Sequence, residues 1–326
     1  MGSFLTHTLL KAGHEVTMIA SGSKRETLQR QGLIIEHRLQ HKETVDRPEI
    51  AEHPDEVHYD AVFSAVQGQE HNSLIPELAE IDTGLVVLVG NNPRAKETAE
   101  EFRKYSGDKS LLFGFQYTAG VQEDGKTVAV YHGNGSMTVG GLEEEASLSD
   151  KKLLNAIFFH TGYQLEYTDH MDGWLLCHAA MVLPIFFVSY ANDCNLRKVE
   201  GKTLDEMIFA IKEGYSLLRK LGTEIRPKRD VEFLRSGLGT SLVKLVFVIM
   251  SKTMLGELAA ADQCRIAVSE KEWMDTVFQD LKKKTRESGW ITGKDCGREC
   301  RTGRKSMRPM ISRKRRISAF FIMFVM

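Results

Sequence analysis

The chain has 326 residues, of which 42% are hydrophobic and 27% are charged, a composition typical of a globular protein with room for two domains. Its formal net charge is -1, but residues 294–316 hold ten Lys or Arg and two Asp or Glu, which leaves 33 basic and 42 acidic residues elsewhere. An acidic body argues against a nucleic-acid-binding core. Five scattered cysteines argue against a disulfide framework, so a reducing, cytoplasmic location is expected.

Residues 1–20 combine a short helix, a turn and a strand. Apolar residues from Phe4 to Leu10 recur near helical spacing, Gly13 can take the left-handed turn that ends a helix, and residues 16–20 are apolar. This order follows the phosphate-binding glycine turn in a Rossmann βαβ unit.

The strand and the glycine turn that open a complete Rossmann unit are not found. Of the motif GxGxxG only one glycine, Gly2, can be matched. The first strand is therefore expected to be missing, which would leave strands 16–20 and 61–66 without their shared neighbour. Gly2 and Thr6 also fit a myristoylation pattern, but burial of the helix over residues 4–13 is the favoured explanation.

Further apolar runs alternate with helical patterns up to residue 146. Compact apolar strands are predicted over residues 61–66 and 85–90, with a helix over 69–81 between them. Other predicted elements are a helix over 21–31, a strand over 33–36, a helix over 95–105, a strand over 111–116, and a hairpin over 128–132 and 136–140. The pattern predicts an α/β domain at residues 1–146, with a Rossmann-type doubly wound parallel sheet.

After residue 147 the composition changes to helices. They are predicted over 150–161, 171–192, 203–221, 231–261 and 269–288, with a brief strand over 164–168. Residues 147–293 are therefore assigned to an all-helical domain for substrate binding and dimerisation, with the site expected in the cleft between the domains. Residues 173–191 have the length of a membrane span, but they contain His178 and Pro184 and lack a basic flank, so no integral membrane segment is predicted.

Residues 294–326 have no regular period. A basic block precedes a few apolar residues, which favours a disordered or wrongly assigned terminus, with a membrane-surface tail as the alternative. Cys296 and Cys300 lack a second Cys or His pair, so no metal site is predicted.

Several of these segments together resemble the ketopantoate reductases (2-dehydropantoate 2-reductases), from Gly2 to about Gly289. GSFLTHTLLKAGHEVTMIASG is similar to the family's post-glycine helix and second strand, YDAVFSAVQ to its fourth strand, and VLVGNNP to its asparagine-bearing loop. HGNGSMTVGG resembles the hairpin before the domain change, and DGWLLCHAAMVLP the inter-domain helix. Members of this family reduce a 2-oxo acid with NADPH, so the resemblance implies NADP as the cofactor and a small 2-oxo acid as the substrate.

The resemblance also implies a set of cofactor-binding residues. Ser21 stands where the family has an arginine for the adenosine phosphate, so Lys24 and Arg25 are expected to substitute, although solvated surface charge explains them equally well. Gln67 stands at a family lysine and is neutral. The cofactor-binding candidates are Gly2, Ser3, Lys24, Arg25, Gln67 and Asn91.

Asn91 matches the loop asparagine that contacts both cofactor and substrate in the family. It follows a buried strand at its carboxyl end, where open α/β sheets bind ligands. The alternative is that Asn91 and Asn92 cap a turn before Pro93.

The family's catalytic lysine is expected just after Trp174, where this chain has Leu175 and Leu176. His178, further along the same helix, is the candidate acid because the pKa of histidine is naturally near the working pH; the alternative is a core residue. The family glutamate that binds the substrate hydroxyl falls at Glu272, or less favourably at Glu270. A charged stretch on a helix is also typical of a solvated face.

The leading hypothesis is thus a reductase of a small 2-oxo acid that uses NADPH. One alternative is a non-catalytic or truncated relative that keeps the fold without the lysine and the glycine turn. Another is a membrane-associated interaction protein that uses the basic tail.

Overall fold

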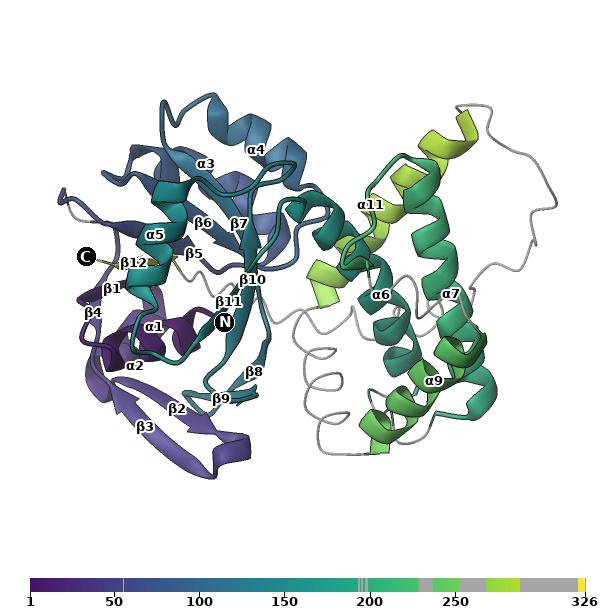
Figure 1. The fold of residues 1–326 in the computed structure, drawn as a ribbon. Coiled ribbons are helices and arrows are strands. Elements are labelled where there is room, and N and C mark those ends of the chain that lie inside the picture. Colours follow the sequence, from purple (N-terminus) through teal and green to yellow (C-terminus); the bar gives the residue numbers. More distant parts are fainter. Residues whose placement is uncertain are drawn as a thin grey trace. The chain divides into compact units, whose positions relative to one another are not determined.

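The computed structural model describes residues 1–54, 56–192, 194, 196, 199–228, 237–252, 268–287 and 322–325. The chain forms two compact units (Figure 1). The N-terminal unit comprises Met1–Asp172 and Ser318–Met326, and the helical unit comprises Gly173–Ile317. The N-terminal unit therefore extends beyond residue 146, the end of the first domain in the sequence-based division.

Strands in the described residues form two sheets in the N-terminal unit. The larger has the order β11-β10-β7-β6-β5-β12-β1-β4. Its strands are β1 (Val16–Ile19), β4 (Glu49–Ala51), β5 (Ala61–Ser64), β6 (Leu85–Val89), β7 (Ser110–Gln116), β10 (Ser136–Gly140), β11 (Gln164–Tyr167) and β12 (Ile322–Val325). β5, β6 and β7 are parallel to one another, and every residue of β5 and β6 is buried. This confirms the α/β fold and the two central parallel strands predicted from their continuous apolar runs.

One strand of this sheet comes from the C-terminal segment. β12 lies between β1 and β5 and pairs antiparallel with both (Figure 1). The prediction that β1 and β5 lack a shared neighbour is therefore wrong, as is the prediction of a residue 294–326 tail without regular structure where it covers Ile322–Val325. The physical reason is that backbone groups in the middle of a sheet need partners on both sides. Residues 288–321 lie outside the described part.

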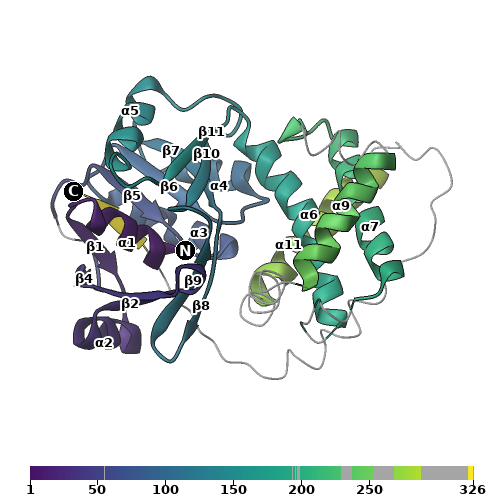
Figure 2. The ribbon, with the colours of Figure 1, turned by 60° about the horizontal axis from the view of Figure 1, so that its bottom comes forward.

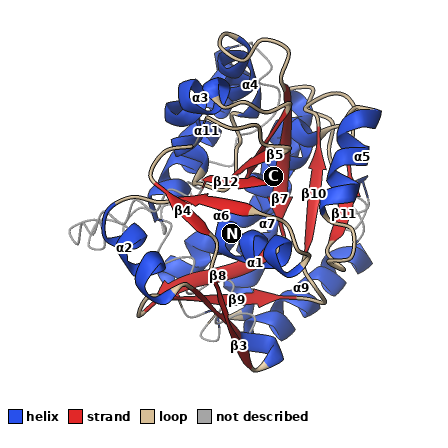
Figure 3. Cartoon of the chain, turned by 90° about the vertical axis from the view of Figure 1, so that its left-hand side faces the viewer, coloured by secondary structure: helices blue, strands red, loops and turns tan. Residues whose placement is uncertain are grey.

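The smaller sheet has the order β3-β2-β9-β8 (Figure 3). Its strands are β2 (Leu33–His37), β3 (Lys42–Asp46), β8 (Thr118–Glu123) and β9 (Lys126–Tyr131). The predicted hairpin of residues 128–132 with 136–140 is wrong, because β9 pairs with β8 and β2 whereas β10 pairs with β7 and β11. The hairpin turn is Asp124-Gly125, where both residues have a positive φ, as a tight turn of this kind requires.

Helices precede or follow most strands of the larger sheet. They are α1 (Gly2–Lys11), α2 (Gly22–Gln31), α3 (His71–Glu80), α4 (Ala95–Arg103) and α5 (Leu148–Ile157), with short 3-10 turns at Arg38–Gln40 and Gly68–Glu70. The first eight residues of α1 are buried, and its Phe4, Leu5 and Leu9 belong to the same core as β1 and β5. α1 is therefore held along its length by the sheet.

The helical unit consists of long helices in its described part (Figure 2). They are α6 (Met171–Ala191), α7 (Gly201–Lys220), α9 (Gly237–Lys252) and α11 (Val268–Glu287). α6 and α11 share a small apolar core of Ala179, Leu183 and Met274. By length and composition α6 can cross a membrane, with a mean hydropathy of 1.8, but 56% of that window is buried inside the protein, as in the core helix of a soluble protein.

Candidate functional site

The start of α1 and the carboxyl ends of β5 and β6 meet at one place in the N-terminal unit. Gly90, which follows β6, has a φ of 146°. A Cβ at this position would lie 3.1 Å from the main-chain oxygen of Val66, just after β5, and 3.4 Å from the side-chain methyl of Met1. The crowding explains the glycine, and it brings the start of α1 next to the strand ends where ligands of open α/β sheets bind.

The first turn of α1 offers donors to an anion. The first N–H groups of a helix have no intrahelical acceptor, and no side chain caps this end of α1. Ser3 is 1% exposed, and its hydroxyl has no hydrogen-bond partner within the described residues. With Gly2 beside it, this end fits the phosphate groups of a dinucleotide.

Lys24 lies on α2, close to the start of α1. Burial lowers the pKa of Lys24 to about 7. Burial and then the charge of Lys24 lower the pKa of the Met1 amino group to about 6, which shows that the two groups are near each other. A buried ammonium group is poorly solvated by water, so a nearby anion stabilises its charged form.

Arg25 does not share this environment. It forms an ion pair with Glu52 at 2.7 Å, and the two side chains are 36% and 51% exposed. The surface-charge interpretation therefore describes Arg25, while Lys24 is the cation near the start of α1.

Gln67 is engaged in local structure at the end of β5. Its side chain and that of Glu70 form a reciprocal cap on the turn Gly68–Glu70, and Gln69 Nε2 donates to Gln67 Oε1 at 2.7 Å. Gln67 therefore stabilises the loop at this site.

The two asparagines after β6 differ in their surroundings. Asn92 is 2% exposed, accepts from the N–H of Arg94 at 3.1 Å and donates to Thr98 Oγ1 at 3.0 Å. Asn92 thus caps the turn before α4. Asn91, directly after Gly90, is only partly buried and is the one at the strand-end site.

His178 lies on α6, in the helical unit. Its ring stacks on Trp174, one turn earlier, with centroids 5.1 Å apart and planes 9° apart. Burial, and then the charge of Lys271, lower the pKa of His178 to about 3. The ring is therefore neutral near pH 7, and the expectation that its pKa lies near the working pH is wrong, because an apolar helix interior disfavours the charged form.

Lys271 and Glu270 form a buried ion pair at the start of α11. Lys271 Nζ lies 2.6 Å from Glu270 Oε2, with side chains only 1% and 6% exposed. The same ammonium lies 4.4 Å from the centre of the Phe186 ring on α6. Glu270 is thus the buried carboxylate of this segment, whereas Glu272 is partly exposed.

Sequence reasoning missed Lys271. The family resemblance places a lysine only just after Trp174. The charged stretch around Glu272 predicts either a glutamate that binds the substrate hydroxyl or a solvated helix face. Helical spacing contains the missing signal, because Lys271 lies three residues before the buried Met274 and seven before Phe278, on the same face of α11.

No cluster of three or more His, Cys, Asp or Glu side chains in the described part of the chain is arranged to hold a metal ion. The chemistry in this part rests on a lysine, a histidine, an asparagine and carboxylates. Side chains of these kinds can bind anions, orient a carbonyl compound and transfer protons; Asn91 lies in the N-terminal unit, and His178, Lys271 and Glu270 lie in the helical unit.

The fold is a Rossmann-like α/β unit followed by a helical unit. Residues 1–144 match the model of the family described as Ketopantoate reductase PanE/ApbA. No curated protein sequence matches the chain.

Solved structures with the same fold include D-mandelate dehydrogenase with NADH and anilino(oxo)acetate. It is 14% identical, over 95% of this chain and 94% of that one, with a TM-score of 0.67. The 2-dehydropantoate 2-reductase from Methylococcus capsulatus is 16% identical over 87% and 94%, with a TM-score of 0.56. The 2-dehydropantoate 2-reductase from Porphyromonas gingivalis W83 is 16% identical over 85% and 94%, with a TM-score of 0.58.

Proposed function

We propose that this protein is an oxidoreductase that reduces a small 2-oxo acid with NADPH. The observation that carries the proposal is the ketopantoate reductase domain over residues 1–144, because it contains all the cofactor-binding candidates. The structural similarity to D-mandelate dehydrogenase, whose structure holds NADH and anilino(oxo)acetate, supports the same class of reaction.

The N-terminal unit would bind the cofactor. The first N–H groups of α1 and the buried Ser3 hydroxyl would donate to its pyrophosphate, with Gly2 allowing close approach. Lys24 would bind the adenosine phosphate that distinguishes NADPH from NADH. Asn91 would orient the nicotinamide and the substrate. When bound, the nicotinamide supplies the hydride.

The helical unit would supply the proton. The ketone oxygen of a 2-oxo acid takes up a proton as it becomes an alcohol. Because burial lowers the pKa of His178 to about 3, we assign the role of the acid to the Lys271 ammonium and give His178 the role of hydrogen-bonding the substrate. Glu270 holds the ammonium in place at 2.6 Å. Glu272 remains the candidate for the substrate hydroxyl.

The second candidate is a relative that keeps the fold without activity. It is favoured by Leu175 and Leu176, which are buried where the family's lysine is expected, and by Gln67, which caps a turn in place of a lysine. Such a protein would bind NADPH weakly and would not turn over.

The test is oxidation of NADPH and of NADH at pH 7 with a panel of 2-oxo acids, including ketopantoate and benzoylformate. Turnover with NADPH is expected, and Lys24→Met should raise the KM for NADPH about tenfold while leaving that for NADH nearly unchanged. Arg25→Met is the matched control, because Arg25 is already paired with Glu52. Cofactor binding without turnover on any substrate would favour the inactive relative.

Two further parts of the proposal concern the cellular location and the oligomeric state of the enzyme. We infer a cytoplasmic location and a homodimer formed through the helical unit. Cell fractionation and light scattering of the purified protein test them. A monomeric, fully active enzyme would exclude a functional requirement for the dimer.

A further inference from the structure

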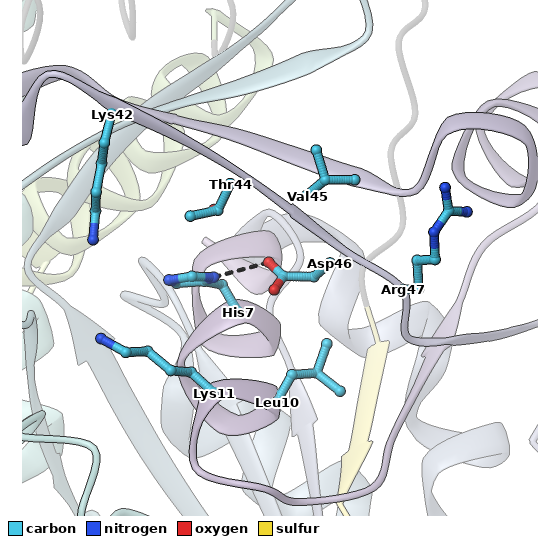
Figure 4. Close-up of a pocket in the computed structure, with 8 residues that line it drawn as sticks. All are labelled: His7, Leu10, Lys11, Lys42, Thr44, Val45, Asp46 and Arg47. Atoms are coloured by element: carbon cyan, nitrogen blue, oxygen red, sulfur yellow. Dashed lines mark hydrogen bonds and ion pairs between the residues drawn. The ribbon is translucent and has the colours of Figure 1, made fainter.

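A cavity of about 600 Å³ lies between α1 and β3, away from the first turn of α1 (Figure 4). The lining residues come from the second half of α1 and from β3 with the residue after it. They are His7, Leu10, Lys11, Lys42, Thr44, Val45, Asp46 and Arg47. The candidate cofactor residues lie at the opposite end of α1, so the pocket is separate from that site.

His7 is held in the pocket by a carboxylate. Its Nδ1 lies 2.8 Å from Asp46 Oδ2. This contact fixes the orientation of the ring. Figure 4 shows Nε2 on the other edge of the ring, directed into the pocket, with the amino groups of Lys11 and Lys42 on that side.

The positive charge of this pocket exceeds the negative charge. Lys11, Lys42 and Arg47 line it with His7, against a single carboxylate, Asp46. In the described residues none of these three cations takes part in an ion pair. Figure 4 shows Arg47 directed away from the two lysines, so Lys11, Lys42 and His7 form the convergent group.

The pKa of the neighbouring His37 indicates that the electrostatic potential around this pocket is positive. Burial, and then the positive charges of His7 and Lys42, lower the pKa of His37 to about 4. His37 is itself fixed, because its Nδ1 lies 2.6 Å from the Tyr131 hydroxyl and its Nε2 lies 2.8 Å from Thr44 Oγ1. Its ring is 4.8 Å from that of His7, so a rigid, neutral group supports one side of His7.

The helix itself offers a simpler explanation for part of this charge. A lysine in the last turn of a helix interacts favourably with the partial negative charge of the carbonyl end, about half a unit. That explains Lys11, but it does not explain Lys42, which comes from β3.

We propose that this pocket binds a phosphate dianion, either inorganic phosphate or the phosphate group of a small phosphomonoester. Lys11 and Lys42 would donate to its oxygens, and the Nε2 edge of His7, whose ring Asp46 orients, would face the same anion. Two ammonium donors suit the multiple acceptor oxygens of phosphate. The site does not depend on the reductase activity.

Calorimetric titration of the full chain with inorganic phosphate, and separately with phenyl phosphate, tests the proposal at low ionic strength. Binding with a dissociation constant of about 1 mM or below is expected. Lys42→Met and Lys11→Met should each weaken it about tenfold, since each removes one charge-assisted hydrogen bond. The tighter of the two ligands shows whether free phosphate or a phosphomonoester is the natural source.

Lys126→Met is the matched control, because Lys126 is a surface lysine paired with Glu43 outside the pocket. It should bind as the unchanged protein does. Melting temperatures show that each variant is folded, and the double variant Lys11→Met/Lys42→Met, which leaves the His7–Asp46 contact intact, should bind no phosphate. Absence of binding by the unchanged protein up to about 10 mM, or equal weakening in Lys126→Met, would overturn the proposal.

Discussion

Two ion pairs, one from each unit, differ in their exposure to water. In the N-terminal unit, pairs such as Arg25–Glu52 are 36% and 51% exposed, so water screens them. In the helical unit, the Lys271–Glu270 pair is 1% and 6% exposed among apolar side chains. The contacts themselves are nearly equal in length, at 2.7 and 2.6 Å. Because the two distances are nearly equal, the burial of the pair decides how much stability is lost when one partner is removed.

Removal of one partner from each pair should show the largest difference. Lys271→Met removes the ammonium that lies 2.6 Å from the buried Glu270 carboxylate, which should lower the free energy of unfolding by about 3 to 5 kcal/mol. Arg25→Met should lower it by no more than about 1 kcal/mol. Urea unfolding of the two variants and the unchanged protein measures both values.

A double variant separates stability from chemistry. Lys271→Met/Glu270→Gln removes both charges and should recover most of the lost stability. If Lys271 is the proton donor, this folded protein should still turn over at least about a hundredfold more slowly. A double variant with normal turnover would assign Lys271 a structural role only.

The same dependence on partners applies to the main chain at the middle of the larger sheet. Phe324 of β12 pairs with Thr17 of β1 and with Val62 of β5. Phe324→Pro removes an N–H group and disturbs the pairing, and each buried group left unpaired costs about 1 to 3 kcal/mol. Phe324→Leu, which keeps the backbone donor, is the control. Equal melting temperatures for the two variants would show that β12 contributes little to the sheet.

Asn91 and Asn92 allow a finer comparison within one loop. Asn92→Ala breaks two hydrogen bonds at the turn before α4 and should lower stability by about 1 to 3 kcal/mol. Asn91→Ala should raise the KM for the cofactor about tenfold and lower the melting temperature less than Asn92→Ala does. Thermal unfolding and steady-state kinetics on both variants measure the two effects. If Asn91→Ala lowered the stability and Asn92→Ala raised the KM, then Asn91 would be the turn cap and Asn92 the cofactor contact.

Features that depend on residues close together in the sequence could be predicted, whereas features that depend on contacts between distant residues could not. β5 and β6 are continuous apolar runs, so their burial is a local property, and Asn91 follows from its place at a strand end. The position of β12 depends on pairing between the two ends of the chain, and no local pattern specifies that pairing.

The helical unit was harder to predict for a related reason. A helical pattern indicates which face of α11 is buried, but it does not identify the helix that packs on that face. Lys271 acquires its role from Phe186 and His178 on α6, far away in sequence. The pKa of His178 likewise depends on burial that the sequence alone does not specify.

The last comparison concerns pH, and it takes one histidine from each unit. The pKa values of His178 and His37 are lowered to about 3 and about 4, from about 6.5 in an unfolded chain. At a pH between the pKa of each histidine in the folded protein and about 6.5, the unfolded chain binds more protons than the folded protein. Stability should therefore fall as the pH is lowered from about 6.5, by at most about 1.4 kcal/mol per pH unit for each histidine.

Phenylalanine variants isolate these contributions, because phenylalanine does not titrate. The stability difference between the unchanged protein and His178→Phe should change steadily from pH 6.5 to the lowest pH at which the protein stays folded. The corresponding difference for His37→Phe should level off near pH 4, since the folded protein then begins to take up the same proton. Urea unfolding at half-unit steps of pH measures both curves. A His178 difference that does not vary with pH would mean that its ring is solvated in the folded protein, and the acid role would then return from Lys271 to His178.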